Sequence, residues 1–333
     1  MARPTHPCPR RAIETPAGWP KPFCFGQFGE LALRHLPWAY PMNHWLVLCA
    51  LAFVTTHVDA ATPWTDPDMR ATWTQPQQPF RIYGNTYYVG SHGLSAILIT
   101  SPKGHVLIDG TLPENAGMIE SNIRALGFRV RDIKLILNSH THGDHAGAIA
   151  ALVHDSGAQV AASAMSAKAL ELGGDDPDDP QHGMAPFYPK VSKIRIVADG
   201  ETVHVSSLAL QMHAMPGHTP GGSGWTWRSC EENRCLSIVY ADSISLLSTD
   251  DYRYTDPTHP ERLAGYRHAL AVLSALPCDI LLTPHPRDGF FEKAAAMAPG
   301  KPNPLIDTQA CKAYADEGQH NLEQRMRKEA GTL

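Results

Sequence analysis

Short apolar segments bounded by Gly, Pro, Asn and Asp residues recur from residue 80 onward, a pattern typical of β-strands joined by turns. In the first half of the chain these segments predict strands at residues 80–83, 86–89, 95–100, 105–109, 133–137 and 159–162. Gly84-Asn85 is a turn signal between the first two segments, so they are expected to form a hairpin. The run 133–137 is the most apolar, which predicts a buried strand.

Helical spacing of apolar residues appears between these strands. Residues 113–126 predict an amphipathic helix that ends at Gly127. An alanine-rich segment from His145 to about residue 155 predicts a second helix. Residues 163–172 predict a third, for which Ser163 is a suitable N-cap.

The second half repeats the order of strands followed by helix. Strands are predicted at residues 193–197, 201–204, 208–214, on both sides of the segment 230–235, and at 279–283. Residues 260–276 predict a helix whose core-facing stripe contains Leu263, Tyr266, Leu270 and Leu273. A charged helix that begins near Cys311 follows. Because strands followed by helix occur twice, the pattern favours an α+β fold with two sheets packed between helices.

The longest interruption of this regularity is the segment 173–189, which contains four prolines and apolar residues near its end. Loops of this length commonly carry function. Two interpretations remain open, a solvated excursion and a segment that covers a substrate.

The composition is that of a globular enzyme, with 333 residues, 43% hydrophobic residues, 18% charged residues and a formal charge of -5. This length fits one large domain or two small ones. No cluster of Lys and Arg occurs in the body of the chain, which argues against a nucleic-acid-binding surface.

The N-terminal residues do not continue the pattern. Residues 1–41 are rich in Pro and Arg and lack periodicity, whereas residues 42–54 resemble the apolar core of a secretory signal. That core is too short to span a bilayer comfortably, and Val58-Asp59-Ala60 offers small residues for cleavage before Ala61. Arg10-Arg11 lies too far upstream to act as a twin-arginine signal.

These features predict a non-native or disordered extension at 1–41, a signal peptide at 42–60 and one domain at 61–333, which would leave no membrane span after cleavage. A start codon placed too early, with Met42 as the true start, is favoured over a disordered tail. Export would carry the protein to the periplasm.

The cysteines agree with export. Cys8, Cys24 and Cys49 fall in the removed region, and an even number remains: Cys230, Cys235, Cys278 and Cys311. The first two are predicted to close a hairpin loop as a disulfide, and a bond between the last two would fix the C-terminal helix. Four free buried thiols are the alternative, which an oxidising compartment disfavours.

Candidate metal ligands concentrate where the strand 133–137 meets the next helix. His140, His142, Asp144 and His145 lie within six residues of one another, at a place where α/β folds commonly carry their sites. Imidazole and carboxylate suit zinc, and three ligands with an open water position indicate a catalytic site. An isolated histidine is usually a surface or core residue, but this spacing is seldom accidental.

Two further histidines also follow predicted strands. His218 lies in a Gly/Pro-rich turn, Pro216-Gly-His-Thr-Pro, and His285 follows Thr283-Pro. Their placement matches that of the first cluster, so the chain offers six ligands for two metal ions.

On these residues the chain resembles the metallo-β-lactamase superfamily, and within it the third subclass of class B β-lactamases. The narrower resemblance rests on residues 216–227, the two cysteine pairs and the segment Tyr240-Ala-Asp-Ser243-Ile-Ser245. It covers roughly residues 83–311. His92 departs from the pattern, because some relatives carry a cysteine there and form an extra disulfide.

The resemblance implies a four-layer αββα sandwich with two zinc ions, the first held by His140, His142 and His218 and the second by Asp144, His145 and His285. It implies hydrolysis of penicillins, cephalosporins and carbapenems by a zinc-bound hydroxide, which confers antibiotic resistance and requires no serine nucleophile. Asp144 would also orient the nucleophile. The partner would be a small-molecule β-lactam, and the protein is expected to be a monomer.

Roles outside the ligand set are less defined. By resemblance, Ser243 and Ser245 would hydrogen-bond the carboxylate of the substrate, although they could also be ordinary serines at a strand end. Asp109 ends a predicted strand and is a candidate for supporting the ligands from behind.

Lactonases and hydroxyacylglutathione thioester hydrolases of the same fold share these ligands, so the fold alone does not identify the substrate. In many of those enzymes an aspartate after the third histidine bridges both metals, and Asp242 lies at a suitable position. A β-lactamase of the third subclass instead predicts that Ser243 faces the metals and that Asp242 is turned away. A non-enzymatic zinc-binding protein is a weaker alternative.

Overall fold

The computed structural model describes Trp64 and residues 66–332, so the predictions for residues 1–41 and 42–60 lie outside the described residues. Two β-sheets form the centre of this part. The first has seven strands in the order of the chain: β1 (Phe80–Tyr83), β2 (Thr86–Tyr88), β3 (Ile97–Ile99), β4 (His105–Ile108), β5 (Ile133–Leu137), β6 (Gln159–Ala162) and β7 (Arg195–Ile196). Pairing is antiparallel from β1 to β4 and parallel from β4 to β7.

The second sheet has five strands in the order β12-β11-β10-β9-β8. They are β8 (Thr202–Val205), β9 (Leu208–Ala214), β10 (Ser223–Glu231), β11 (Arg234–Tyr240) and β12 (Ile280–Leu282). Only β12 is parallel to its neighbour among these strands. The hairpin predicted for residues 80–89 and the one predicted around residues 230–235 are both confirmed, as β1–β2 and β10–β11.

Both faces of each sheet are covered, because alternate side chains of the central strands enter different cores. Ile97 and Ile99 of β3 join the core between the sheets, whereas Leu98 faces the helices on the other side. In the second sheet, Ile238 enters the shared core and Val239 faces a separate helix layer. These positions are fully buried, so the central strands are apolar on both faces.

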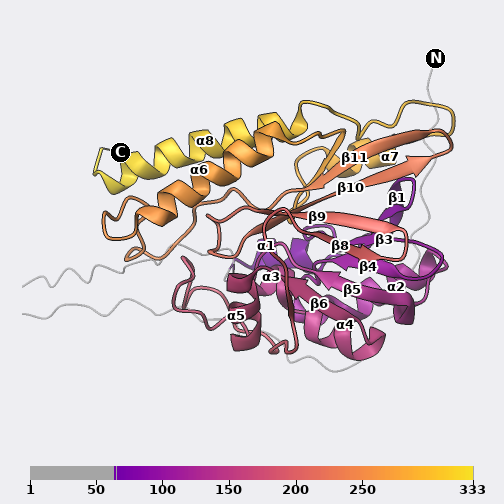
Figure 1. The fold of residues 1–333 in the computed structure, drawn as a ribbon, viewed down its shortest axis with the longest axis horizontal. Coiled ribbons are helices and arrows are strands. Elements are labelled where there is room, and N and C mark those ends of the chain that lie inside the picture. The colour runs from indigo at the N-terminus through magenta and orange to yellow at the C-terminus, as the bar shows by residue number, and fades with distance from the viewer. Residues whose placement is uncertain (1–63, 65, 333) are drawn as a thin grey trace, which may run out of the picture. The chain divides into compact units, whose positions relative to one another are not determined.

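Helices form the two outer layers (Figure 1). The layer beside the first sheet contains α2 (Ala116–Ala125), α4 (Ile149–Ser156) and α5 (Ala164–Leu172), with short 3₁₀ turns η1 (Pro113–Asn115) and η2 (Val130–Asp132). The layer beside the second sheet contains α6 (Pro260–Ala275) and α8 (Ala310–Glu329), which lie side by side. The predicted αββα sandwich is therefore confirmed. No helix within the described residues is both long and apolar enough to cross a bilayer.

The helix predicted after the metal-ligand turn is interrupted. It begins at Gly143 as α3 (Gly143–Ala146), and α4 starts only at Ile149. A Cβ atom at Gly147 would lie 2.3 Å from the carbonyl oxygen of Gly143 and 2.4 Å from Cδ of Pro113. The close approach of Pro113, 34 positions earlier in the chain, therefore requires glycine at this junction.

Two helices have no counterpart in the sequence prediction, α1 (Pro67–Thr74) and α7 (Phe290–Ala295). Asp66 caps α1 by accepting hydrogen bonds from the backbone N–H groups of Asp68 and Met69, and Pro67 occupies the first helical position. The sequence therefore does contain a start signal for α1. The helix buries only Trp73, so it has no apolar period to reveal it.

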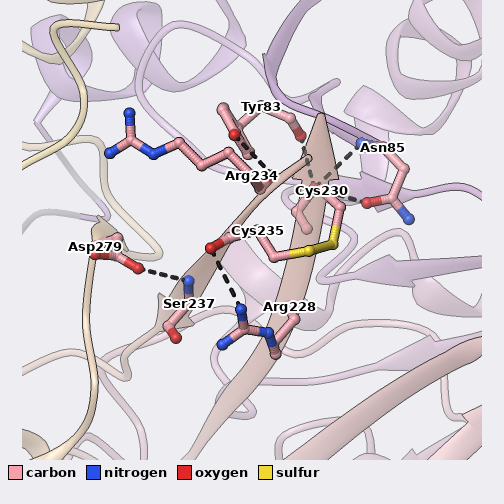
Figure 2. Close-up of a disulfide and its surroundings, with 9 residues drawn as sticks. Tyr83, Asn85, Arg228, Cys230, Arg234, Cys235, Ser237 and Asp279 are labelled. Carbon is pink, nitrogen blue, oxygen red and sulfur yellow. Dashed lines mark hydrogen bonds between the residues drawn. A yellow bond between two sulfur atoms is a disulfide. The ribbon is translucent and has the colours of Figure 1, made fainter. Parts of the chain in front are cut away.

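Both predicted disulfides are present. Cys230 and Cys235 are directly opposed on β10 and β11, next to the β1–β2 turn, where Tyr83 donates a hydrogen bond to the carbonyl of Arg234 (Figure 2). The bond between Cys278 and Cys311 joins the segment before β12 to the first turn of α8, as expected.

Candidate metal centre

The ligand-rich turn lies at the end of β5, where the chain crosses into α3. His140 and His142 belong to the connection, and Asp144 and His145 belong to the single turn of α3. His142 precedes α3 and its carbonyl accepts hydrogen bonds from the N–H groups of His145 and Ala146, at 3.0 and 2.8 Å. This tight turn aims four ligand side chains at one region.

The structure brings His218 to the first two histidines. Nδ1 of His142 lies 3.1 Å from Nε2 of His218, and the ligand atoms of His140, His142 and His218 all lie within 4.8 Å of one another. Nε2 of His140 is buried without a hydrogen-bond partner. Zinc–nitrogen bonds of about 2.0–2.1 Å in a tetrahedron would separate the nitrogens by about 3.3 Å. The spacing of His142 and His218 therefore fits a shared zinc ion.

A second triangle forms beside the first. Oδ2 of Asp144 lies 3.2 Å from Nε2 of His145 and 3.3 Å from Nε2 of His285, and the two histidine nitrogens are 3.1 Å apart. Asp144 Oδ1 is buried and has no hydrogen-bond partner. Because His285 is 43% exposed, this second group is open to solvent on one side.

The outward nitrogens of the first three histidines each meet an acceptor. His140 Nδ1 donates to Asp242 Oδ1 at 2.7 Å, His142 Nε2 donates to Asp179 Oδ1 at 3.0 Å, and His218 Nδ1 donates to the carbonyl of Ser245 at 2.9 Å. Each contact fixes a tautomer whose other nitrogen, turned toward the cluster, carries a lone pair. Metal-binding histidines are commonly oriented in this way.

The pKa values follow from burial and from these contacts. Burial lowers the pKa of His218 to about 3, and burial with the neighbouring histidines lowers that of His140 well below its usual value. Burial alone would raise the pKa of Asp144, but His145 and His285 hold it well below its usual range. His140 and His218 are thus held as neutral imidazoles and Asp144 as an ionised carboxylate, the forms that bind a divalent cation. At His142 burial lowers the pKa, but the neighbouring Asp179 carboxylate outweighs this effect and raises it.

Comparison with known proteins agrees with this geometry. The family model described as "Metallo-beta-lactamase superfamily" matches residues 90–230. The structure of Rm3 metallo-beta-lactamase is 48% identical, with a TM-score of 0.75, over 78% of this chain and 97% of that one. MEM-A1, a subclass B3 metallo-beta-lactamase from a soil metagenome library, is 44% identical over 78% of this chain and 100% of its own, also with a TM-score of 0.75. The chain belongs to the metallo-β-lactamase superfamily.

Other relatives support the narrower assignment. MIM-1 from Novosphingobium pentaromativorans is 44% identical over 78% of this chain and 93% of its own, with a TM-score of 0.73. Among curated proteins, the uncharacterized protein YobT of Bacillus subtilis is 29% identical over 170 residues, which is 50% of this chain and 68% of YobT. The structural relatives at 40–48% identity place this metallo-β-lactamase-fold protein with subclass B3, whose dinuclear zinc sites its two clusters match.

The metal centre opens into a cavity of about 300 Å³. Its lining includes His142, Asp144, His218 and His285, together with Ser243 and Ser245. Asp242 is 1% exposed and is not part of the lining. Its carboxylate lies behind His140, on the nitrogen that faces away from the cluster.

Asp109 supports the turn without contacting a ligand side chain. Its carboxylate accepts hydrogen bonds from Asn138 Nδ2, from the N–H and Oγ of Ser139, and from the hydroxyl of Tyr240, at 2.7–3.1 Å. Asn138 and Ser139 immediately precede His140, so Asp109 holds the start of the ligand turn.

Sequence reasoning missed six residues at the site, among them Leu247, which lines the cavity close to Ser245. Trp64, Met69 and Trp73 at α1 form one wall of the cavity, and Gln181 of the 173–189 loop forms part of another. Asp179 of the same loop contacts His142. The length of that loop was a signal for Gln181 and Asp179, whereas the N-terminal wall offered only the Asp66-Pro67 helix start.

Proposed function

We propose that this protein is an exported, zinc-dependent β-lactamase that hydrolyses the lactam amide of penicillins, cephalosporins and carbapenems and so confers antibiotic resistance. The observation that carries the proposal is the pair of ligand triangles with Ser243, and not Asp242, on the cavity side. The subclass B3 relatives support the substrate class. Lactonases and thioester hydrolases of the same fold are the alternative. Their bridging aspartate would correspond to Asp242, which instead contacts the nitrogen of His140 that faces away from the cluster.

In this proposal His140, His142 and His218 hold one zinc ion, and Asp144, His145 and His285 hold the other. The two ions would supply a hydroxide at neutral pH and polarise the lactam carbonyl. Asp144 contributes in two ways, because Oδ2 faces His145 and His285 while the buried Oδ1 is free to accept a hydrogen bond from the attacking water. Asp144 thus binds metal and orients the nucleophile.

Metal dependence tests the proposal. The purified protein should hydrolyse a carbapenem, lose the activity on exhaustive chelation and regain it with zinc, while inhibitors directed at a catalytic serine have no effect. His218→Ala and Asp144→Ala should each lower kcat/KM by orders of magnitude. His154→Ala is the matched control, because the side chain of His154 is 86% exposed and pairs with Asp155 outside the site. Activity that survives chelation would refute the mechanism, and faster turnover of lactones or thioesters would favour the alternative.

Ser243 and Ser245 are proposed to bind the carboxylate of the substrate. Both line the cavity, and the contact of Ser245 with His218 uses its backbone carbonyl, so a side-chain change leaves that contact in place. Ser243→Ala should raise KM about tenfold, since a hydrogen bond to a charged group contributes about 1.5 kcal/mol. An esterified substrate, which lacks the carboxylate charge, should be hydrolysed equally by both proteins. A fall in kcat with unchanged KM would argue against this role.

Export is proposed from the N-terminal sequence and is supported by the two disulfides. With Met42 as the start and cleavage after Ala60, protein from a periplasmic fraction should begin at Ala61 and behave as a monomer in sedimentation. Its intact mass should be lower than that of the reduced chain by four hydrogen atoms, two for each disulfide. Detection of residues 1–41 on the exported protein would contradict the assignment of the start.

A further inference from the structure

The loop 173–189 is attached to the metal-ligand turn at two adjacent residues. The hydroxyl of Tyr188 donates to the carbonyl of Thr141 at 2.7 Å, and Asp179 Oδ1 lies 3.0 Å from Nε2 of His142. The loop is therefore held against the turn that carries four of the six candidate ligands. Between these two attachments, Gln181 reaches the cavity wall.

Hydrogen bonds within the loop hold the carboxylate of Asp179 in position. Its side chain is 8% exposed, and the same Oδ1 atom accepts a hydrogen bond from the N–H of Gln181 at 2.7 Å. The N–H of Asp179 donates to the carbonyl of Asp176, whose own carboxylate is tied to Lys168 of α5 at 2.9 Å. These contacts fix Asp179 from both sides, so its position at His142 does not depend on one side-chain torsion.

The loop also contacts the segment that follows Ser245. The N–H of Thr249 donates to the carbonyl of Pro180 at 2.9 Å, and the segment that contains Thr249 also carries Ser243 and Ser245. The residue next to Asp179 in the loop is therefore joined to the segment that also carries Ser243 and Ser245.

His142 is the link between the loop and the metal. Its Nδ1 faces His218, so its Nε2–H is the group that Asp179 accepts. A cation on Nδ1 makes the Nε2–H a stronger donor, and a carboxylate at Nε2 makes Nδ1 a better ligand. The two effects are thermodynamically linked. The free energy by which metal binding strengthens the Asp179–His142 hydrogen bond equals the free energy by which that hydrogen bond strengthens metal binding.

We propose that Asp179 is a positioning residue that couples the order of the 173–189 loop to metal occupancy of the first site. Metal binding at His142 tightens the loop through Asp179, and the loop in turn strengthens metal binding. The inference rests on the proposed function only in taking the first site to hold zinc.

Zinc affinity provides the first test. Metal-free protein is titrated with zinc against a chromophoric chelator, for wild type, Asp179→Ala, Asp179→Asn and the control Asp178→Asn. Asp178 lies on the same loop and carries the same charge, but its side chain is 58% exposed and it pairs with Lys168. Affinity for the first zinc should fall about 10–100-fold in Asp179→Ala. Asp179→Asn should be intermediate, because the amide oxygen still accepts the hydrogen bond without the charge, and Asp178→Asn should match wild type.

Hydrogen exchange of the wild type and of the same variants provides the second test. Backbone amides 176–184 should become more protected when zinc is added, while the amides of α6, in the opposite helix layer, serve as the internal reference. The zinc-dependent gain should be lost in Asp179→Ala and kept in Asp178→Asn. Loop protection that is independent of zinc in the wild type, or an unchanged first zinc affinity in Asp179→Ala, would overturn the proposal.

Neither readout uses a lactam. A protein that fails to hydrolyse β-lactams but shows zinc-dependent protection through Asp179 would refute the proposed function and leave this inference intact. If the protein is a zinc-dependent β-lactamase but the protection of its loop does not depend on Asp179, the proposed function stands and this inference is refuted.

Discussion

Asp242 contacts His140 on the side of the ring that faces away from the ligand cluster. Its Oδ1 atom accepts a hydrogen bond from His140 Nδ1 at 2.7 Å, behind the ring, while Oδ2 is buried without a partner. Burial raises the pKa of this carboxyl well above its usual value. A cation on the far side of His140 would favour the ionised form, because it offsets the buried negative charge.

Replacement of Asp242 tests this role. Asp242→Asn should still bind two zinc ions, with affinity at the first site about tenfold weaker, because the amide retains the acceptor and loses the charge. Metal content at saturating zinc and the first dissociation constant, measured together, check the prediction. Loss of the second zinc ion would instead identify Asp242 as a bridging ligand and favour a lactonase or thioester hydrolase.

At the scale of single residues, the sequence predicted those residues of the site that belong to a short, recognisable motif. His140, His142, Asp144 and His145 share one turn, and His218 and His285 each follow a strand and a Pro or Gly. Asp179 could not be found in the same way, because an aspartate in an acidic, proline-rich loop resembles a solvated residue until the fold brings it to His142. The role of Asp109 was expected only in outline, since its partners lie about 30 and 131 positions away.

At the scale of elements, the break between α3 and α4 fixes the direction of the ligand turn. Gly147 lies between them, in contact with Pro113 of η1. The sequence predicted one continuous helix because alanine-rich residues continue through this point. The break depends on a tertiary contact and not on local propensity, so periodicity could not reveal it.

Gly147→Ala should therefore destabilise the protein and weaken zinc binding together. The new Cβ would lie 2.3 Å from a backbone oxygen and 2.7 Å from the backbone nitrogen of Pro113, so the backbone must move, at a cost of about 3 kcal/mol. Gly117→Ala in α2 is the control, because its Cβ would meet no atom within 4 Å, and it should stabilise by about 0.5–1 kcal/mol. Urea denaturation and zinc titration of both variants measure the contrast. Equal effects would show that the junction tolerates a side chain.

The last turn of α8 holds the segment that follows Ser245. Arg325 donates to Ser248 Oγ and to the carbonyl of Tyr252, both at 2.7 Å, and Glu329 accepts from the N–H groups of Tyr254 and Thr255. Burial alone would raise the pKa of Glu329, but hydrogen bonds from the Thr255 hydroxyl, from Arg325 and from these N–H groups lower it to about 2, from 4.5. The depressed pKa means that the ionised form contributes stability above pH 4.5, which is lost as the pH falls toward 2.

Comparison of wild type with Glu329→Gln by urea denaturation checks this pH dependence. The variant should be less stable by roughly 2–3 kcal/mol at pH 7, and the difference should disappear as the pH approaches 2. Both proteins are measured without metal, so that release of zinc in acid does not contribute. Glu323→Gln, on an exposed part of α8, is the control and should change stability little. A difference that persists at low pH would assign the effect to packing and not to charge.

For the whole molecule, the sequence predicted the layers because each central strand carries apolar residues on both faces. Val106 and Ile108 face the other sheet, while Leu107 faces the helices, so β4 must be covered twice. The order of strands within each sheet and the shortness of β7 did not follow from local pattern, since they depend on pairing between distant segments. The covering of the metal centre by α1 and by the 173–189 loop is also a property of the complete fold.

The two disulfides stabilise the whole molecule to different extents, and this difference is testable. Cys278 and Cys311 are 33 positions apart and connect the second sheet to α8, whereas Cys230 and Cys235 are 5 apart and already opposed in a hairpin. Loop-closure entropy predicts a cost of roughly 4 kcal/mol for losing the first bond and roughly 2 kcal/mol for losing the second.

Urea denaturation of the zinc-loaded double variants Cys278→Ala/Cys311→Ala and Cys230→Ala/Cys235→Ala should therefore show the larger loss in the first. Carbapenem hydrolysis at 25 °C, the reference temperature for these free energies, should be unchanged in both, because none of the four cysteines lines the cavity. Since Cys278 and Cys311 are buried at 9% and 2% exposure, removal of their sulfur atoms also creates space in the α6–α8 core and adds to the first cost. Equal losses would mean that the hairpin disulfide stabilises the native sheet directly, by more than the closure of its short loop accounts for.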